Sequence, residues 1–196
     1  MKQLEGNQII VGPVRLSYMN AFKPRRNDNK DRDEYSATLL FPKASHEHLS
    51  DPKSELVAIN AAIEKVLLEK FKVKPPVWES ALKDGDKTLN QNTGEPKHPG
   101  YWYMNATAKA EYPPALVNRA KNKAQEEDGW VSGDWGYVKL ALFTYDQKGK
   151  KGVSCGLRAI QFMFKDEPLG GGGSNADGFD ATEAPATEDD GFDPFA

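Results

Sequence analysis

Residues 134–164 read DWGYVKLALFTYDQKGKKGVSCGLRAIQFMF, and this stretch decides the fold. Apolar and polar side chains alternate over much of residues 134–145 and 152–164, which is the two-residue period of a strand. The segment between them, DQKGKK, combines glycine with polar residues and is typical of a turn. The sequence therefore predicts two strands joined as a hairpin.

Three further stretches fit strands: residues 7–18 (NQIIVGPVRLSY), 34–41 (EYSATLLF) and 101–110 (YWYMNATAKA). In the first, the alternation places Val14, Leu16 and Tyr18 on one face, and Pro13 indicates an edge or a bulge where the strand begins. The polar segment between the first two strands is expected to be a hairpin-like loop rich in cations that could grip phosphate.

One helix is expected from Asp51 to about Lys72. Asp51 and Pro52 suit the N-cap and the first helical position. Apolar residues then recur at helical spacing: Leu56, Ile59, Ile63, Val66, Leu67 and Phe71. Five short strands with one inserted helix predict a mainly β fold, an OB-fold-like five-stranded Greek-key barrel. An immunoglobulin-like sandwich would need about seven strands.

The composition changes at residues 169–175, LGGGGSN, where four consecutive glycines disfavour an ordered backbone. We expect residues 1–169 to form the barrel domain, and residues 170–196 to form a tether and a disordered acidic tail. The tail has seven acids and no Lys or Arg, which leaves 22 acids against 26 basic residues in the first 169. A basic body with an acidic tail indicates a polyanionic partner and an internal competitor for it, although the tail could serve solubility alone.

Several classes of protein are disfavoured. The single Cys155 excludes an internal disulfide framework and is expected to be a buried thiol. No apolar run approaches the roughly 20 residues that span a bilayer, so we expect a soluble protein of the cytoplasm. His46, Glu47 and His48 lack the H-E-x-x-H spacing of a zinc site, and no metal or other cofactor is expected.

Aromatic side chains alternate with cations and amides on the predicted strands. Tyr137, Lys139 and Phe143 share one face of their strand, which is too polar for a core. Bases of single-stranded DNA stack on such rings while Lys and Arg follow the phosphates, so binding would tolerate many sequences. The residues expected to bind DNA are Arg15, Trp102, Tyr103, Tyr137, Lys139 and Arg158, with phosphate contacts from Arg25, Arg26, Lys30 and Arg32.

Seven segments, taken in order, resemble the family of phage single-stranded DNA-binding proteins. They are VRLSYMNAF from residue 14, YSATLLFPK, LKDGDK, GYWYMNATAKAEYPPALVNR, SGDWGYVKLALFTYD, KGVSCGLRAIQFMFKDEPLGGG and the acidic-aromatic end. The resemblance implies an OB-fold and a non-enzymatic protein that coats single strands during replication and recombination. It also implies that the tail tip docks into replication proteins through Asp189, Asp190, Phe192, Asp193 and Phe195.

Two other functions stay open from the sequence. Asp84 and Asp86 in KDGDK could contribute to a metal-dependent nuclease, although a tight turn explains them more simply. A strand-annealing recombination protein would also bind single strands. Homo-oligomers are compatible with either function.

Overall fold

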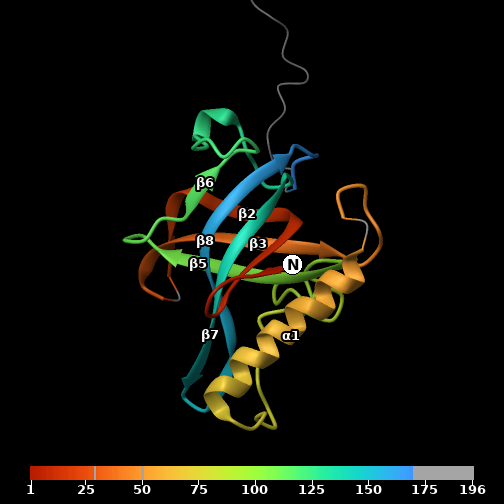
Figure 1. Cartoon of the computed structure of the whole chain (residues 1–196), viewed down its shortest axis with the longest axis vertical. Helices are drawn as coiled ribbons and strands as arrows, with labels where there is room; N and C mark the ends of the chain where they lie inside the picture. The colour runs from red at the N-terminus through yellow and green to blue at the C-terminus, as the bar shows by residue number, and fades with distance from the viewer. Residues whose placement is uncertain (29, 50, 170–196) are drawn as a thin grey trace, which may run out of the picture.

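The computed structural model describes residues 1–28, 30–49 and 51–169. The expected tether and acidic tail lie outside these residues. The elements, drawn in Figure 1, are β1 (Lys2–Gln3), β2 (Gln8–Asn27), β3 (Arg32–Pro42), α1 (Pro52–Phe71), β4 (Lys83–Asp84), β5 (Tyr101–Lys109), β6 (Ala115–Val117), a 3-10 turn (Glu126–Asp128), β7 (Trp135–Gln147) and β8 (Lys150–Phe164).

The long strands β2, β3, β5, β7 and β8 form a closed barrel. β5 pairs with β3, β3 with β2, β2 with β7 and β7 with β8, all antiparallel. The barrel closes where β5 runs parallel to β8, with Ala106 opposite Cys155. This strand order is that of an OB-fold, so the predicted fold class is confirmed, as is the β7–β8 hairpin.

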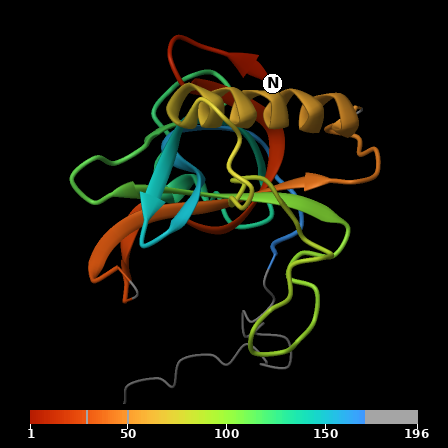
Figure 2. The same ribbon diagram turned by 90° about the horizontal axis from the view of Figure 1, so that it is seen from below.

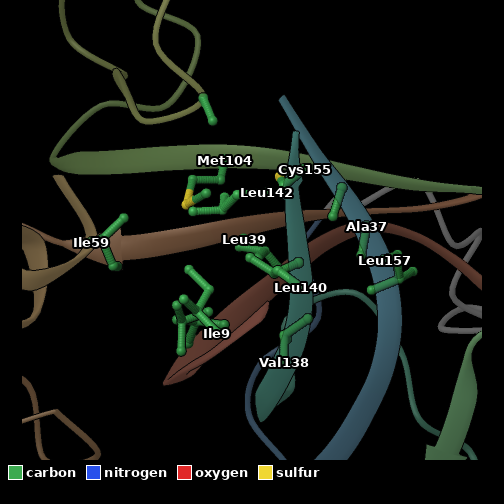
Figure 3. Packing of buried hydrophobic residues seen from close by; sticks show 14 of the residues in the cluster. Ile9, Ala37, Leu39, Ile59, Met104, Val138, Leu140, Leu142, Cys155 and Leu157 are labelled. Carbon is green, nitrogen blue, oxygen red and sulfur yellow. The ribbon is translucent and has the colours of Figure 1, made fainter. Parts of the chain in front are cut away.

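The interior of the barrel is built from the inward-facing half of each strand. Leu39 pairs with Met104, and both are fully buried. On β7, the inward residues are Val138, Leu140 and Leu142, as the alternation predicts. Figure 3 shows these side chains converging on one cluster with Ile9 and Ile59. Cys155 belongs to the same cluster, and burial raises the pKa of its thiol to about 12.

The helix α1 packs against β2, β3, β7 and β8 (Figure 2). It begins as predicted, because Pro52 is its first residue and the Asp51 carboxylate accepts a hydrogen bond from the Ser54 N–H at 3.0 Å. The predicted apolar stripe faces the barrel, with Ile59 and Ile63 fully buried. Among the described residues, no helix is long and apolar enough to cross a membrane.

The first barrel strand differs from its prediction. β2 continues to Asn27, so Arg25 and Arg26 lie on a strand and the predicted loop shrinks to a short connection. The β2–β3 register shifts between Ser17 and Asn20, which turns the Tyr18 side chain away from the face of Val14 and Leu16. The prediction that Tyr18 shares that face is therefore wrong. In the pairing of β2 with β7, the register shifts between Val11 and Val14, which agrees with the bulge expected near Pro13.

Candidate nucleic-acid interface

A groove of about 550 Å³ lies on the outer surface of the barrel. The β2–β3 connection forms one border, the β7–β8 hairpin forms another, and β5 and β8 provide the floor. Its walls include Lys30, Arg32, Asn105, Thr107, Phe143 and Tyr145. OB-folds bind oligonucleotides on this part of the barrel, between the loop that joins strands 1 and 2 and the loop that joins strands 4 and 5.

The floor is polar with one aromatic ring. Asn105 and Thr107 point outward because Met104 and Ala106 are buried in the core. The Thr38 hydroxyl on β3 donates a hydrogen bond to Asn105 Oδ1 at 2.9 Å, which fixes the amide. Phe143 on β7 is 48% exposed and presents its ring to the groove. The groove thus offers a stacking surface beside amide and hydroxyl groups.

Two cations of the groove, Lys30 and Arg32, pair with one buried acid, Glu34. Lys30 Nζ lies 3.0 Å and Arg32 Nη2 lies 3.3 Å from Glu34 Oε2. Burial alone would raise the pKa of Glu34, but hydrogen bonds from Asn27 and Lys30 outweigh it and lower the pKa. Glu34 is therefore ionised at neutral pH, while the heads of Lys30 and Arg32 stay about half exposed.

Arg25 and Arg26 line a different hollow, together with Asn20 and Ser36. Arg26 also forms an ion pair with Asp31 across the connection. The predicted phosphate-binding cations therefore do not form one cluster. Lys30 and Arg32 belong to the groove, whereas Arg25 and Arg26 line the neighbouring hollow.

The hairpin wall of the groove is anchored to residues 79–81. The Tyr145 hydroxyl donates a hydrogen bond to Glu79 Oε2 at 2.9 Å. Burial and this carboxylate raise the pKa of Tyr145 to about 12, so the phenol is neutral at pH 7. The Glu79 N–H donates to the Lys151 carbonyl at 2.9 Å, and the Val153 N–H donates to the Glu79 carbonyl at 3.0 Å. The wall is thus held at both strands of the hairpin.

Tyr103 and Trp102 do not contribute to the groove. Tyr103 is only 2% exposed because the His98 ring packs edge-on against it, 4.7 Å away between centroids. Trp102 is partly buried against the core, and Lys43 Nζ lies 5.3 Å from its ring centroid. The burial of Tyr103 corrects the expectation that its ring offers a free stacking face. The contact of Trp102 with DNA stays a prediction.

Arg15 also lies outside the groove walls. Its side chain is largely buried and donates hydrogen bonds to the carbonyls of Gly133 at 3.1 Å and Glu167 at 2.9 Å. Asp166 lies 3.7 Å away. Arg15 thus fastens the segment after β8 to β2, which favours a structural role over the predicted contact with DNA.

Tyr137 and Lys139 lie outside the groove walls but face outward on the same strand as Phe143, and both are partly buried. The predicted face of Tyr137, Lys139 and Phe143 is therefore confirmed. Arg158 is exposed on β8, where the register shifts opposite Lys139 and Leu140. Their contact with DNA stays a prediction.

The carboxylates considered for a nuclease are held by a lysine. Lys43 forms ion pairs with both Asp84 and Asp86, and these hydrogen bonds lower the pKa of each carboxyl group. Asp86 also accepts a hydrogen bond from the Gly100 N–H at 2.7 Å. The described residues contain no group of three or more potential metal-ligating side chains. This geometry agrees with a structural turn.

Some residues of the groove were not among those selected from the sequence. Asn105 and Phe143 stood on the polar faces that the alternation defined, and Thr107 and Tyr145 continue the same two-residue period. The signal was present, but the period alone does not show where the hairpin and the β2–β3 connection enclose a groove.

A closed five-stranded barrel with this strand order defines an OB-fold protein. The chain belongs to the family of the ssDNA-binding protein of Enterobacter phage Enc34, whose family model matches residues 7–192. This membership confirms the resemblance found in the sequence. The family comprises DNA-binding proteins and not enzymes, in agreement with the expected lack of catalysis.

Individual relatives are distant in sequence but similar in length. Protein p50 of Acyrthosiphon pisum secondary endosymbiont phage 1 is 26% identical, with 85% of this chain and 88% of the relative covered. The Enc34 protein in complex with ssDNA has a TM-score of 0.68 at 23% identity, covering 85% of this chain and 91% of the other. The ssDNA-binding protein gp2.5 of bacteriophage T7 has a TM-score of 0.53 at 14% identity, covering 91% and 100%.

Proposed function

We propose that this protein binds and coats single-stranded DNA through the groove between the β2–β3 connection and the β7–β8 hairpin. The observation that carries the proposal is the exposed ring of Phe143 in the same groove as Lys30 and Arg32. A ring and cations are the two components that sequence-tolerant binding of single strands requires.

Each component has a distinct task. Phe143 stacks on one base, which does not depend on base identity because every base has a π-face. Lys30 and Arg32 pair with neighbouring phosphates and release counterions, which makes the affinity depend on salt. Asn105 and Thr107 offer hydrogen bonds to bases or sugars on the floor.

The proposed setting is phage DNA replication and recombination in the cytoplasm of the host cell. In this proposal the acidic tail competes with DNA for the basic groove, and the glycine-rich segment tethers it at high local concentration. Its tip then recruits replication proteins, because Phe192 and Phe195 can fill apolar pockets while Asp189, Asp190 and Asp193 meet basic residues around them.

Substitution of the ring and of a cation separates the two components. Phe143→Ala should weaken binding to poly(dT) by about 1 to 3 kcal/mol with little change in the salt slope. Lys30→Ala should flatten the slope of log K against log salt by about 0.7 or less. Tryptophan fluorescence titrations across a salt series measure both quantities.

Two exposed residues that do not line the groove provide matched controls, Tyr112→Ala for the ring and Lys65→Ala for the cation. Neither should change the affinity by more than a small factor. Unchanged binding in both Phe143→Ala and Lys30→Ala, with both variants folded, would show that DNA does not occupy this groove.

A further inference from the structure

A second hollow, of about 390 Å³, lies on the outer surface near the beginning of β5. Its walls include Ser17, Tyr18, Leu40, Lys97, His98 and Tyr101. Three of these side chains are rings, and one is a cation. The hollow therefore has the same two components as the groove but is built from other residues.

Tyr18 is presented to solvent by a strained piece of backbone. Its φ is +45°, which is uncommon for a residue other than glycine, and its side chain is 67% exposed. The conformation is held from both sides, because the Met19 N–H donates to Ser132 Oγ at 2.9 Å and Asn20 Nδ2 donates to the Tyr18 carbonyl at 3.2 Å. Such maintained strain clusters at functional sites.

His98 lines this hollow and carries an unsatisfied polar atom. The side chain is only 7% exposed, and its Nε2 is buried with no hydrogen-bond partner in the part of the chain that the structure describes. Burial and the neighbouring Lys97 lower the pKa of His98, so the ring is neutral at pH 7. A buried polar atom without a partner destabilises the fold, and a ligand with a polar edge could remove this cost.

The hollow and the groove lie along the same strand. Tyr101 lines the hollow, while Asn105 and Thr107 line the groove, and all three share the outward face of β5. Between them, His98 covers Tyr103. Six residues of a strand span about 20 Å, so a single strand that leaves the groove along β5 can reach the hollow after a few nucleotides.

We propose that this hollow receives one unpaired base of the bound single strand. The inference rests on the proposed function and extends it by a second contact point. The base packs against the ring of Tyr18, its polar edge gives His98 a partner, and Lys97 pairs with the adjacent phosphate. A nucleobase fits this chemistry because it combines a flat apolar face with donors and acceptors on its edge.

Oligonucleotide length tests the proposal. Tyr18→Ala should weaken binding to an oligo(dT) of about 20 nucleotides by about 5- to 150-fold, the usual cost of losing one stacked base. It should leave the affinity for an oligo(dT) of about 4 nucleotides, which fills the groove alone, unchanged. Tyr112→Ala is the matched control, because Tyr112 is 66% exposed and lines neither the groove nor the hollow. Fluorescence anisotropy measures the affinities of the wild type and of both variants for the two oligonucleotides.

Tyr18→Gly guards against a general folding defect. Glycine accepts the positive φ without strain, so this variant should be at least as stable as the wild type but lose the same affinity. In the wild type, replacing bases by abasic sites one at a time in the longer oligonucleotide should reveal a position that weakens binding. In Tyr18→Gly, an abasic site at that position should not weaken binding any further.

The outcomes separate this inference from the proposed function. If Tyr18→Gly binds the longer oligonucleotide as the wild type does while Phe143→Ala binds it weakly, the hollow takes no base and the groove proposal stands. If Tyr112→Ala loses as much as Tyr18→Ala, the effect is not specific and the inference fails. If the wild type binds neither oligonucleotide, both proposals fail.

Discussion

Glu34 holds Lys30 in the proposed DNA groove, with Oε2 of the acid 3.0 Å from Nζ of the lysine. The carboxylate is buried, and Asn27 also donates a hydrogen bond to it at 2.6 Å. An acid at this position restrains the cations that meet phosphate but also repels phosphate itself. The effect of removing its charge therefore decides which influence is larger.

We expect the repulsion of phosphate by Glu34 to outweigh its positioning of the cations. Without the charge of Glu34, Lys30 and Arg32 would still lie beside the short β2–β3 connection, so little positioning would be lost. Glu34→Gln keeps the shape and should bind single-stranded DNA more tightly at low salt, with an advantage that shrinks as salt screens it. A salt series by fluorescence titration measures this. Glu69→Gln, on an exposed part of α1, is the control. Weaker binding by Glu34→Gln at low salt would show that positioning dominates.

Arg15→Ala should affect stability and not DNA binding. Its two hydrogen bonds to the Gly133 and Glu167 carbonyls are charge-assisted, so their loss should lower the free energy of unfolding by about 2 kcal/mol. Urea denaturation measures the stability, and the salt slope for poly(dT) should match that of the wild type. A flattened slope in a variant of unchanged stability would restore the original assignment of Arg15 as a DNA contact.

Gly133 should tolerate no side chain. It has φ +119°, and an added Cβ would lie 2.2 Å from the Glu167 carbonyl oxygen. Gly133→Ala should therefore destabilise the fold by about 2 kcal/mol or more. Gly94→Ala separates the clash from the backbone strain, because Gly94 has φ +74° with nothing within 4 Å of the added Cβ. It should cost only about 1 kcal/mol. Equal losses of unfolding free energy in Gly133→Ala and Gly94→Ala would exclude the clash with the Glu167 carbonyl as the cause of the destabilisation.

The ion pairs of Lys43 should make stability depend on acid pH. The pKa values of Asp84 and Asp86 are lowered in the folded state, so their contribution is complete above the unfolded value of about 3.9 and is lost as the pH falls through the folded values. Asp84→Asn with Asp86→Asn should be less stable than the wild type at neutral pH. The difference should narrow toward pH 2, as thermal unfolding at several pH values would show.

The same double variant addresses the nuclease hypothesis. It should bind poly(dT) almost as well as the wild type, because Asp84 and Asp86 lie outside the groove walls. Neither protein should cleave a labelled single strand in magnesium. Cleavage by the wild type that disappears in the double variant would contradict the proposed function.

The alternation of side chains predicted the five long strands, because each strand has one face in the core. The barrel itself was inferred from the number of strands, the one helix and the resemblance to a family, since alternation does not reveal the order of strands in a sheet. Alternation predicted that Tyr103 faces outward, but not that His98 covers the ring. That cover comes from the long segment before β5, whose path depends on tertiary contacts such as the hydrogen bond from the Gly100 N–H to Asp86. The predicted face of Tyr18 was wrong for a related reason. The register shift between Ser17 and Asn20 breaks the simple alternation of faces in that part of β2.

The acidic tail offers the last prediction, which concerns residues outside those that the structure describes. Seven acids tethered to a basic body should compete with DNA for the groove through a high local concentration. Truncation after Gly170 should therefore tighten binding to poly(dT) at low salt, and the advantage should shrink as salt screens the tail. Phe192→Ala with Phe195→Ala should keep the wild-type DNA affinity, because the charges remain, but should abolish the capture of replication proteins from infected-cell extract. Equal affinities of the full-length and truncated proteins at every salt concentration would exclude competition, and undiminished capture by the double variant would show that the rings are not the anchor.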